Sequence, residues 1–314
     1  MTAIQRNEYA VAFCVDRNFL NFALFMIRQI AFHNPMRRFD FVIASQDTLE
    51  IPGWAAGYDI RLHRIGTLPD LPTPARFRGS MAPYFRILLP LELKADYRRI
   101  LYLDADMFVE GGDVSRLMDQ DLGPHPLAAT QDAPSLYLPN FRPREFIDAG
   151  IPLTRYANSG ALLIDTASYA EQDVAGRAFA QADKHETGVH LADQSLFNLA
   201  LRGQFAELSP AWNWQLSGSL PLITLRYPVF LRHFIGKKKP NNTVNDPRDA
   251  RFHQAYAEHF ALYAPDELAK MVPPYDPQPM ALGRIVKLAL YHLRARPLMK
   301  ERLARFKDPY QVLL

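Results

Sequence analysis

The sequence has a single cysteine, Cys14, among its 314 residues. One cysteine cannot form an internal disulfide, and it excludes a cysteine-rich zinc site. Glycine and proline are also modest in number, at 15 and 25 residues, which excludes collagen-like and low-complexity chains. A protein without disulfides is typical of a reducing compartment.

Long apolar runs and a secretory leader are missing as well. The longest uncharged segment, residues 208–225, contains two prolines, an asparagine, a glutamine and several serines, so it cannot be an apolar membrane span. The first residues lack the basic, apolar and small-residue pattern of a signal peptide. We therefore expect a soluble, cytoplasmic protein.

Net positive charge is missing outside the C-terminal segment. The formal net charge is +3, but residues 281–314 carry eight Lys and Arg residues against two acids. The remaining residues therefore sum to a small negative charge, which argues against nucleic-acid binding by the body of the protein. With 48% apolar and 12% aromatic residues, the chain can bury a large core, and intrinsic disorder is excluded.

Short apolar runs and longer helical segments alternate at the start of the chain. Residues 9–15 predict a strand ending at Asp16, residues 19–32 a buried helix, and residues 39–44 a second strand. This order indicates a parallel βαβ unit of an α/β sheet. Such sheets bind ligands at the carboxyl ends of their strands, so the Asp16 loop is a candidate site. A solvated, helix-capping Asp16 is the simpler explanation for this loop alone.

The alternation continues along the chain, with no internal repeats. Further strands are expected at residues 100–103, 127–130, 161–164 and 229–234, and further helices at residues 84–93, 169–182 and 191–201. Residues 132–152 contain four prolines and predict a long irregular loop.

Asp104 and Asp106 directly follow an apolar strand, two positions apart. Two carboxylates this close repel each other, and burial increases the cost. A divalent ion relieves both problems, and oxygen ligands favour Mg²⁺ or Mn²⁺. A second such pair, Asp119 and Asp121, lies in a polar stretch typical of solvated surface. The apolar residues on both sides of Asp104 and Asp106 distinguish the first pair.

His233 lies in the apolar segment 229–234, and Gly236 and Lys239 follow it. A neutral imidazole could complete a carboxylate metal site. A glycine lets the backbone approach a diphosphate closely, and a lysine neutralises its charge. These residues suit a nucleoside diphosphate. A structural histidine with a glycine turn and solvated lysines is the alternative.

Six segments, taken together and in this order, resemble the family 8 glycosyltransferases. These are retaining enzymes of the GT-A fold, and they include glycogenin and the bacterial galactosyl- and glucosyltransferases of lipopolysaccharide biosynthesis. The segments are residues 16–19, 84–86, 101–109, 158–160, 193–194 and 233–240. The resemblance implies an α/β fold with a mostly parallel central sheet flanked by helices. It implies a catalytic domain over residues 1–250 and leaves residues 251–314 as a helical, basic tail.

The resemblance assigns a UDP-sugar donor and a divalent ion to matching residues. Asp16 and Asn18 would hold the uridine, and Gly236 and Lys239 would grip the phosphates. The ligands of Mn²⁺, or of Mg²⁺ in its place, would be Asp104, Asp106 and His233. One departure is Asn241, which stands where the family often has a tryptophan.

Four further residues would surround the donor sugar by the same resemblance. Arg86, Asn158 and Asp193 would hold the sugar, and Gln194 would lie near the anomeric carbon opposite the leaving group. An amide is a poor nucleophile, whereas a retaining hydrolase uses a carboxylate there. We therefore expect front-face attack by a glycan or glycolipid acceptor on a UDP-hexose, with galactose or glucose favoured.

Two alternatives of other classes stay open. A haloacid-dehalogenase-type phosphatase also uses an Asp-x-Asp after a strand, but normally on the first strand of the chain. A catalytically inactive protein that binds a sugar nucleotide or a glycan would keep the same residues. Mn²⁺-dependent release of UDP from a UDP-hexose would separate the three.

We expect the C-terminal segment to contact an anionic membrane surface, on the inner face of the cytoplasmic membrane. Apolar residues recur at helical spacing between basic residues, a pattern that suits a lipid headgroup boundary. Pro297 is expected to interrupt this helix, with a second short helix carrying Met299, Leu303 and Phe306. A helix packed on the catalytic domain is the alternative. The apolar positions are Leu282, Ile285, Val286, Ala289 and Leu293.

Overall fold

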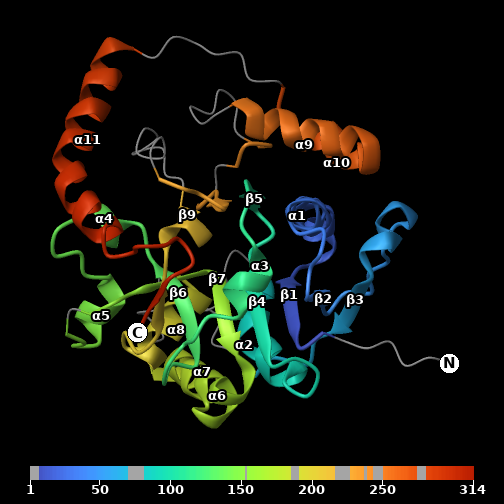
Figure 1. Ribbon diagram of the computed structural model, residues 1–314, viewed down its shortest axis with the longest axis horizontal. Coiled ribbons are helices and arrows are strands. Elements are labelled where there is room, and N and C mark those ends of the chain that lie inside the picture. Colours follow the sequence, from blue (N-terminus) through green and yellow to red (C-terminus); the bar gives the residue numbers. More distant parts are fainter. Residues whose placement is uncertain are drawn as a thin grey trace.

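The computed structural model has an eight-stranded central sheet with helices on both faces (Figure 1). A smaller three-stranded sheet lies above the large one in this view. The structure describes residues 7–69, 81–152, 154–184, 191–215, 227–236, 239–242, 250–273 and 281–314.

The predicted βαβ unit is present. β1 (Tyr9–Cys14) and β2 (Asp40–Ser45) are parallel neighbours, and α1 (Leu20–His33) connects them. The 3₁₀ helix η2 (Gly53–Tyr58) then leads into β3 (Ile60–Arg64), which pairs with β2 in parallel. Asp16 therefore lies at the carboxyl ends of the parallel strands, where a ligand is expected.

The rest of the large sheet mixes directions but stays mostly parallel. β4 (Arg99–Leu103) is parallel to β1, and β6 (Leu127–Gln131) is parallel to β8 (Ala206–Leu208). β7 (Ala157–Asp165) runs antiparallel between β4 and β6, and β11 (Val312–Leu313) runs antiparallel along β8. The strand order is β11-β8-β6-β7-β4-β1-β2-β3, and the predicted fold class is confirmed.

Alternate residues of β1 face two different cores, as the pleat of a covered sheet requires. Ala10 and Ala12 face helices of one layer, whereas Val11 and Phe13 face α1. The segment predicted as one helix at residues 169–182 forms two helices, because Asp173 adopts a left-handed φ of 46° between them. The helices of the first layer are α2 (Ala82–Leu93), α6 (Thr166–Glu171), α7 (Val174–Lys184) and α8 (Asp193–Leu201).

The small sheet brings two distant parts of the chain together. It contains β5 (Met107–Val109), β10 (Leu231–His233) and β9 (Trp214–Gln215). β10 pairs with β5 in antiparallel register, and His233 lies opposite Met107. This register places His233 beside Asp106, the residue that precedes β5.

Residues 132–152 are not the irregular loop that their prolines predict. They contain two short helices, α4 (Pro134–Tyr137) and α5 (Arg144–Asp148). Pro134 lies in the first turn of α4, and Pro143 directly precedes α5. Proline is well tolerated at these positions because the first turn of a helix needs no N–H partner.

Three helices follow the small sheet. α9 (Ala250–Tyr263) and α10 (Pro265–Lys270) lie over α1 and β5, and α11 (Leu282–Leu303) stands at the other side of the molecule (Figure 1). The predicted interruption at Pro297 is wrong, because α11 continues through it. Leu293, whose carbonyl loses its N–H partner there, is exposed like Pro297, so water can replace the missing donor.

The chain returns to the large sheet after α11. β11 lines the outer edge of β8, and Arg305 forms an ion pair of 2.8 Å with the buried Glu207 of that strand. The Trp212 indole N–H donates to the Pro309 carbonyl at 3.1 Å, and the Tyr310 ring packs on the Trp212 ring. Residues 305–313 therefore belong to the main body. Across the described ranges, no helix combines the length and the apolar character needed to cross a membrane.

Candidate active site

Three predicted metal ligands meet where the two sheets join. Asp104 follows β4, and its N–H donates to the Gly160 carbonyl of β7 at 2.8 Å. Asp106 precedes β5, and His233 ends β10. Each of the three offers one ligand atom, and these atoms lie within 4.8 Å of one another.

Two cations compensate the charge of the acidic pair. The Arg86 guanidinium lies 2.8 Å from Asp104 Oδ1, and the Lys239 ammonium binds Asp106 Oδ2. The Tyr102 hydroxyl also donates to Asp104, at 2.8 Å. Burial alone would raise the pKa of Asp106, but Lys239 and His233 hold that pKa below its ordinary value. Asp106 is therefore available as a charged ligand.

The donor set fits a hard divalent ion. Asp106 Oδ1 is buried and has no hydrogen-bond partner among the described residues. His233 Nε2 faces it at 3.5 Å and lies 3.7 Å from Asp104 Oδ2, which is too long for strong hydrogen bonds. Burial lowers the pKa of His233 although both carboxylates raise it, so the ring is neutral at pH 7 and can act as a ligand. Two carboxylates and one imidazole suit Mn²⁺ or Mg²⁺.

Gly160 makes room for this cluster. A Cβ at this position would lie 2.4 Å from His233 Cε1 and 3.0 Å from Asp104 Oδ2. No real Cβ contact is that short, so the imidazole occupies the volume that a side chain would take. The sequence pattern singled out this glycine only as part of the segment 158–160.

Arg86 connects the metal ligands to the start of α8. Besides Asp104, it lies 3.3 Å from the carboxylate of Asp193 and donates to the Ser159 carbonyl at 2.9 Å. Burial lowers the pKa of Arg86, but Asp104 and Asp193 more than offset this, so Arg86 stays charged. Burial raises the pKa of Asp193 to about 6, although Arg86 opposes the shift.

Gln194, Asn158 and Asp132 form a buried polar group beside Arg86. Gln194 Oε1 accepts hydrogen bonds from Asn158 Nδ2 at 3.0 Å and from the Ser159 N–H at 3.3 Å. Asn158 Nδ2 also donates to Asp132 Oδ1 at 3.0 Å. Burial raises the pKa of Asp132. Asp132 was not predicted from the sequence, although it directly follows β6 and so meets the same strand-end criterion as Asp104.

The remaining predicted residues lie in loops around this group. Asp16 Oδ1 accepts the N–H groups of Asn18 at 2.9 Å and of Phe19 at 3.2 Å, so Asp16 caps a 3₁₀ turn before α1. Gly236 has a φ of 82°, which favours glycine, and a Cβ there would meet nothing within 4 Å among the described residues. No described contact joins Asp16, Asn18 or Gly236 to the metal ligands. Their roles in uridine and phosphate binding stay predictions.

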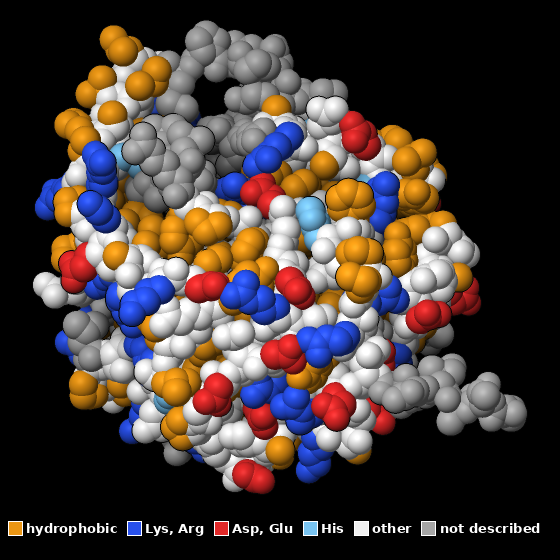
Figure 2. Space-filling model, viewed as in Figure 1, with side chains coloured by type: hydrophobic (Ala, Val, Ile, Leu, Met, Phe, Trp, Pro, Cys, Tyr) orange, Lys and Arg blue, Asp and Glu red, His pale blue; other side chains and the backbone are white. Residues whose placement is uncertain are grey.

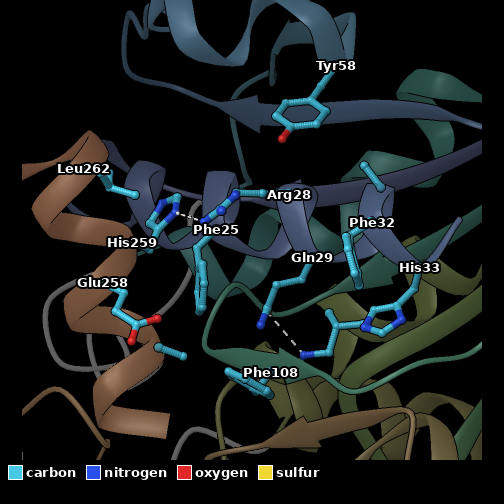
Figure 3. A pocket seen from close by; sticks show the side chains of 13 residues that line it. Phe25, Arg28, Gln29, Phe32, His33, Tyr58, Phe108, Glu258, His259 and Leu262 are labelled. Atoms are coloured by element: carbon cyan, nitrogen blue, oxygen red, sulfur yellow. Dashed lines mark hydrogen bonds between the residues drawn. The ribbon is translucent and has the colours of Figure 1, made fainter. Parts of the chain in front are cut away.

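A separate pocket of about 640 Å³ lies between α1, β5 and α9 (Figure 3). Its walls include Phe25, Arg28 and Phe108, and His259 lies beside Arg28 with 3.4 Å between His259 Nδ1 and the guanidinium. The predicted site residues are not among its lining residues. The volume of this pocket therefore says nothing about the cluster at Asp104.

Comparisons with known proteins show which family model the chain matches and which solved structures share its fold. The family model "Glycosyl transferase family 8" matches residues 61–243, a range that contains Arg86, Asp104, Asp193 and His233. General stress protein A of Bacillus subtilis is 32% identical over 191 residues, covering 55% of this chain and 64% of the relative. Lipopolysaccharide 1,2-glucosyltransferase of Escherichia coli is 27% identical over 210 residues, covering 65% and 61%.

The chain thus spans less than two thirds of the length of each of these relatives. Among solved structures, the galactosyltransferase LgtC in complex with donor and acceptor sugar analogues aligns with a TM-score of 0.61 at 19% identity. The alignment covers 88% of this chain and 99% of that one. At this identity the likeness establishes the fold, which is the predicted GT-A fold.

Proposed function

This chain belongs to glycosyl transferase family 8, and on that premise we propose that it transfers a hexose from a UDP-sugar to a glycan or glycolipid. Galactose and glucose are the favoured sugars, the configuration of the anomeric carbon is retained, and Mn²⁺ or Mg²⁺ is required. The observation that carries the proposal is the convergence of Asp104, Asp106 and His233 beside Arg86 and Gln194. The phosphatase alternative loses its support, because the family match contains the Asp-x-Asp segment after β4.

Asp104, Asp106 and His233 would hold the ion. When bound, it supplies Lewis-acid stabilisation of the negative charge that develops on the departing diphosphate. Lys239 would add a second positive charge, because its ammonium already lies at Asp106. Among the described residues, nothing lies within 4 Å of a Cβ at Gly236, and this would let phosphate oxygens approach the backbone.

Arg86, Asp193 and Asn158 would orient the sugar, since their polar atoms converge beside the metal ligands. Gln194 Oε1 already accepts two hydrogen bonds, and the Gln194 amide also donates to Asp132, so buried partners hold this side chain in place. A carboxamide so engaged is a poor nucleophile. We therefore favour attack from the front face. The bond between C1 and the phosphate oxygen breaks, the bond to the acceptor oxygen forms on the same face, and the acceptor proton moves to the phosphate.

The proposal is tested by a screen of UDP-sugars with Mn²⁺ present, followed by measurement of UDP release. Calorimetry should find UDP binding that is lost in EDTA. The Asp106→Asn variant should lose UDP binding and UDP release. The Asp121→Asn variant, from the exposed second acidic pair, should keep UDP binding and UDP release. Undiminished UDP binding in EDTA would exclude the metal role. UDP binding without turnover of any UDP-hexose would instead identify an inactive binding protein.

Retention of configuration at the anomeric carbon is tested by a separate measurement. NMR of the isolated product should find an α-linkage from an α-linked donor. A β-linkage would exclude the front-face mechanism while leaving hexose transfer intact.

We further propose that α11 places the enzyme on an anionic membrane that carries a glycolipid acceptor. The upper end of α11 stands away from the body and carries apolar side chains (Figures 1 and 2). Ala295 and Met299 at the other end are buried in a hydrophobic cluster with Trp214 and Phe234, so only the part of the helix before Ala295 is free to bind lipid. The exposed apolar residues of this part include Leu282, Ile285, Val286, Leu290 and Leu293.

Flotation with anionic liposomes tests this role. Deletion of residues 281–314 is unsuitable, because it would also remove β11 and the Arg305–Glu207 pair. The double variant Ile285→Ser/Val286→Ser should abolish co-flotation, and raised salt should weaken it since each cation near anionic lipid contributes about 1 kcal/mol. Leu262→Ser, at an exposed leucine of α9, is the matched control and should float as the wild type does. A wild-type protein that stays unbound at low salt would exclude the membrane role.

A further inference from the structure

A chain of buried hydrogen bonds leads from β7 to the imidazole of His233. The Gly160 N–H donates to Asn158 Oδ1 at 3.1 Å. Asn213 Nδ2 donates to the same oxygen at 2.8 Å, and Asn213 Oδ1 lies 3.0 Å from His233 Nδ1. Asn213 is 1% exposed, so water cannot substitute for these partners.

Each side-chain orientation in this chain follows from the one before it. A backbone N–H can only donate, so the Asn158 atom that faces Gly160 must be the oxygen. The Asn213 atom that faces this oxygen must then be the amide nitrogen. The other end of the Asn213 amide is consequently an oxygen, and it accepts a hydrogen bond from His233 Nδ1. A neutral ring with its proton on Nδ1 has its lone pair on Nε2, the nitrogen that faces Asp104 and Asp106.

We propose that Asn213 is a positioning residue that holds His233 in the Nδ1–H tautomer, so that Nε2 is ready to bind the divalent ion. The identity of what Nε2 binds rests on the proposed function, but the tautomer itself does not. Free histidine in water prefers the Nε2–H tautomer, in which Nε2 cannot be a ligand. A partner on the other ring nitrogen commonly fixes the tautomer and orientation of metal-binding histidines.

The imidazole ring of His233 cannot easily adopt another orientation. His233 is buried, and its Cε1 and Nδ1 atoms lie directly over Gly160. Rotation of the ring would move Nδ1 away from Asn213 and leave a buried carbonyl oxygen without its donor, which is unfavourable. The same contact therefore sets both the tautomer and the direction of Nε2.

Long-range ¹H–¹⁵N correlation NMR of the metal-free protein, at a pH where the imidazoles are neutral, tests the proposal. The spectrum of His233→Gln identifies the His233 signals. We expect the Nδ1–H pattern for His233 in the wild type. Asn213→Asp keeps an oxygen toward Nδ1 and should retain that pattern, whereas Asn213→Leu should lose it. An Nε2–H pattern in the metal-free wild type would overturn the proposal.

Mn²⁺ binding, followed by electron paramagnetic resonance without any sugar nucleotide, gives the second readout. Asn213→Leu should weaken Mn²⁺ binding about 10- to 100-fold, and Asn213→Asp should restore most of it. Asn34→Leu removes another buried asparagine, one that donates to the Ile30 carbonyl, and should cost stability without changing the tautomer or Mn²⁺ binding. Unchanged Mn²⁺ affinity in Asn213→Leu would overturn the positioning role.

These measurements separate the proposal from the proposed function. The Nδ1–H tautomer with no turnover of any UDP-sugar would leave Asn213 as a positioning residue and reject the transferase. Turnover of a UDP-sugar by a protein whose metal-free His233 is in the Nε2–H tautomer would support the transferase and reject the positioning role of Asn213.

Discussion

Replacement of Gly160 by alanine is expected to damage the metal site through a single added methyl group. The backbone at residue 160 is not in the left-handed region, so alanine is allowed there and only the space around it matters. The new Cβ would lie 2.4 Å from His233 Cε1, 2.7 Å from His233 Nδ1 and 3.0 Å from Asp104 Oδ2. An ordinary contact between carbon atoms needs about 3.5 Å. The ring must therefore move by about 1 Å, or β7 must yield.

β7 cannot yield easily, because it lies between β4 and β6 and the Gly160 carbonyl accepts the Asp104 N–H. We therefore expect the imidazole to move and Nε2 to leave its place between the carboxylates. Overpacking of a buried site costs about 1–3 kcal/mol of the free energy of unfolding. Disturbance of the shell around a ligand costs about 10- to 100-fold in metal affinity, equivalent to about 1.4–2.7 kcal/mol.

Mn²⁺ affinity by electron paramagnetic resonance and the free energy of unfolding by urea titration measure the two effects separately. Gly57→Ala in η2 is the matched control, because a Cβ there meets nothing within 4 Å among the described residues. It should leave both quantities unchanged. Wild-type Mn²⁺ affinity in a folded Gly160→Ala protein would refute the reasoning, because it would mean either that β7 yields or that His233 is not a ligand.

Three further predictions concern single side chains. Asp106→Asn should lose most of the transferase activity while its thermal midpoint stays close to that of the wild type, because Lys239 keeps its hydrogen bond to the Phe234 carbonyl. Gln194→Ala should lower kcat but leave the Kd for UDP unchanged, and loss of UDP binding would contradict its placement at the sugar. Burial and the nearby Arg28 lower the pKa of His259 to about 4. Because the folded pKa lies below the unfolded value, stability is lost as pH falls from about 6.5 to 4, by about 3 kcal/mol. His259→Phe should remove that loss in urea titrations at a series of pH values.

The sequence predicted the parts of the fold and site that depend on local pattern. The apolar strand before Asp104 and the helix that begins at Asp193 both follow from hydrophobic periodicity. Asp132 could have been predicted by the strand-end criterion, but the prolines after it obscured the end of β6. The interruption predicted at Pro297 was wrong. A proline on an exposed helix face destabilises the helix less than one on a buried face, because water can bond to the carbonyl that loses its partner.

The rest of the site depends on contacts between distant segments. His233 was a candidate ligand from the sequence, but its approach to Asp106 depends on the pairing of the three-residue strand β10 with β5, which leaves no periodic signal in so short a run. Asn213 lies in an irregular turn, and its importance comes only from its two neighbours in space. The space taken by His233 over Gly160 is likewise invisible until β7 and β10 are placed together.

The return of the chain to β8 has a consequence for the kinetics of folding. Glu207 and Arg305 are 98 residues apart, so this edge of the sheet has a high contact order and closes a long loop. Trp212, the neighbour of Asn213, rests on Pro309 and Tyr310. The turn that holds Asn213 can therefore reach its final form only after this long loop has closed. The three metal ligands should then come together late in folding, and added Mn²⁺ should slow unfolding without accelerating the refolding of the chain.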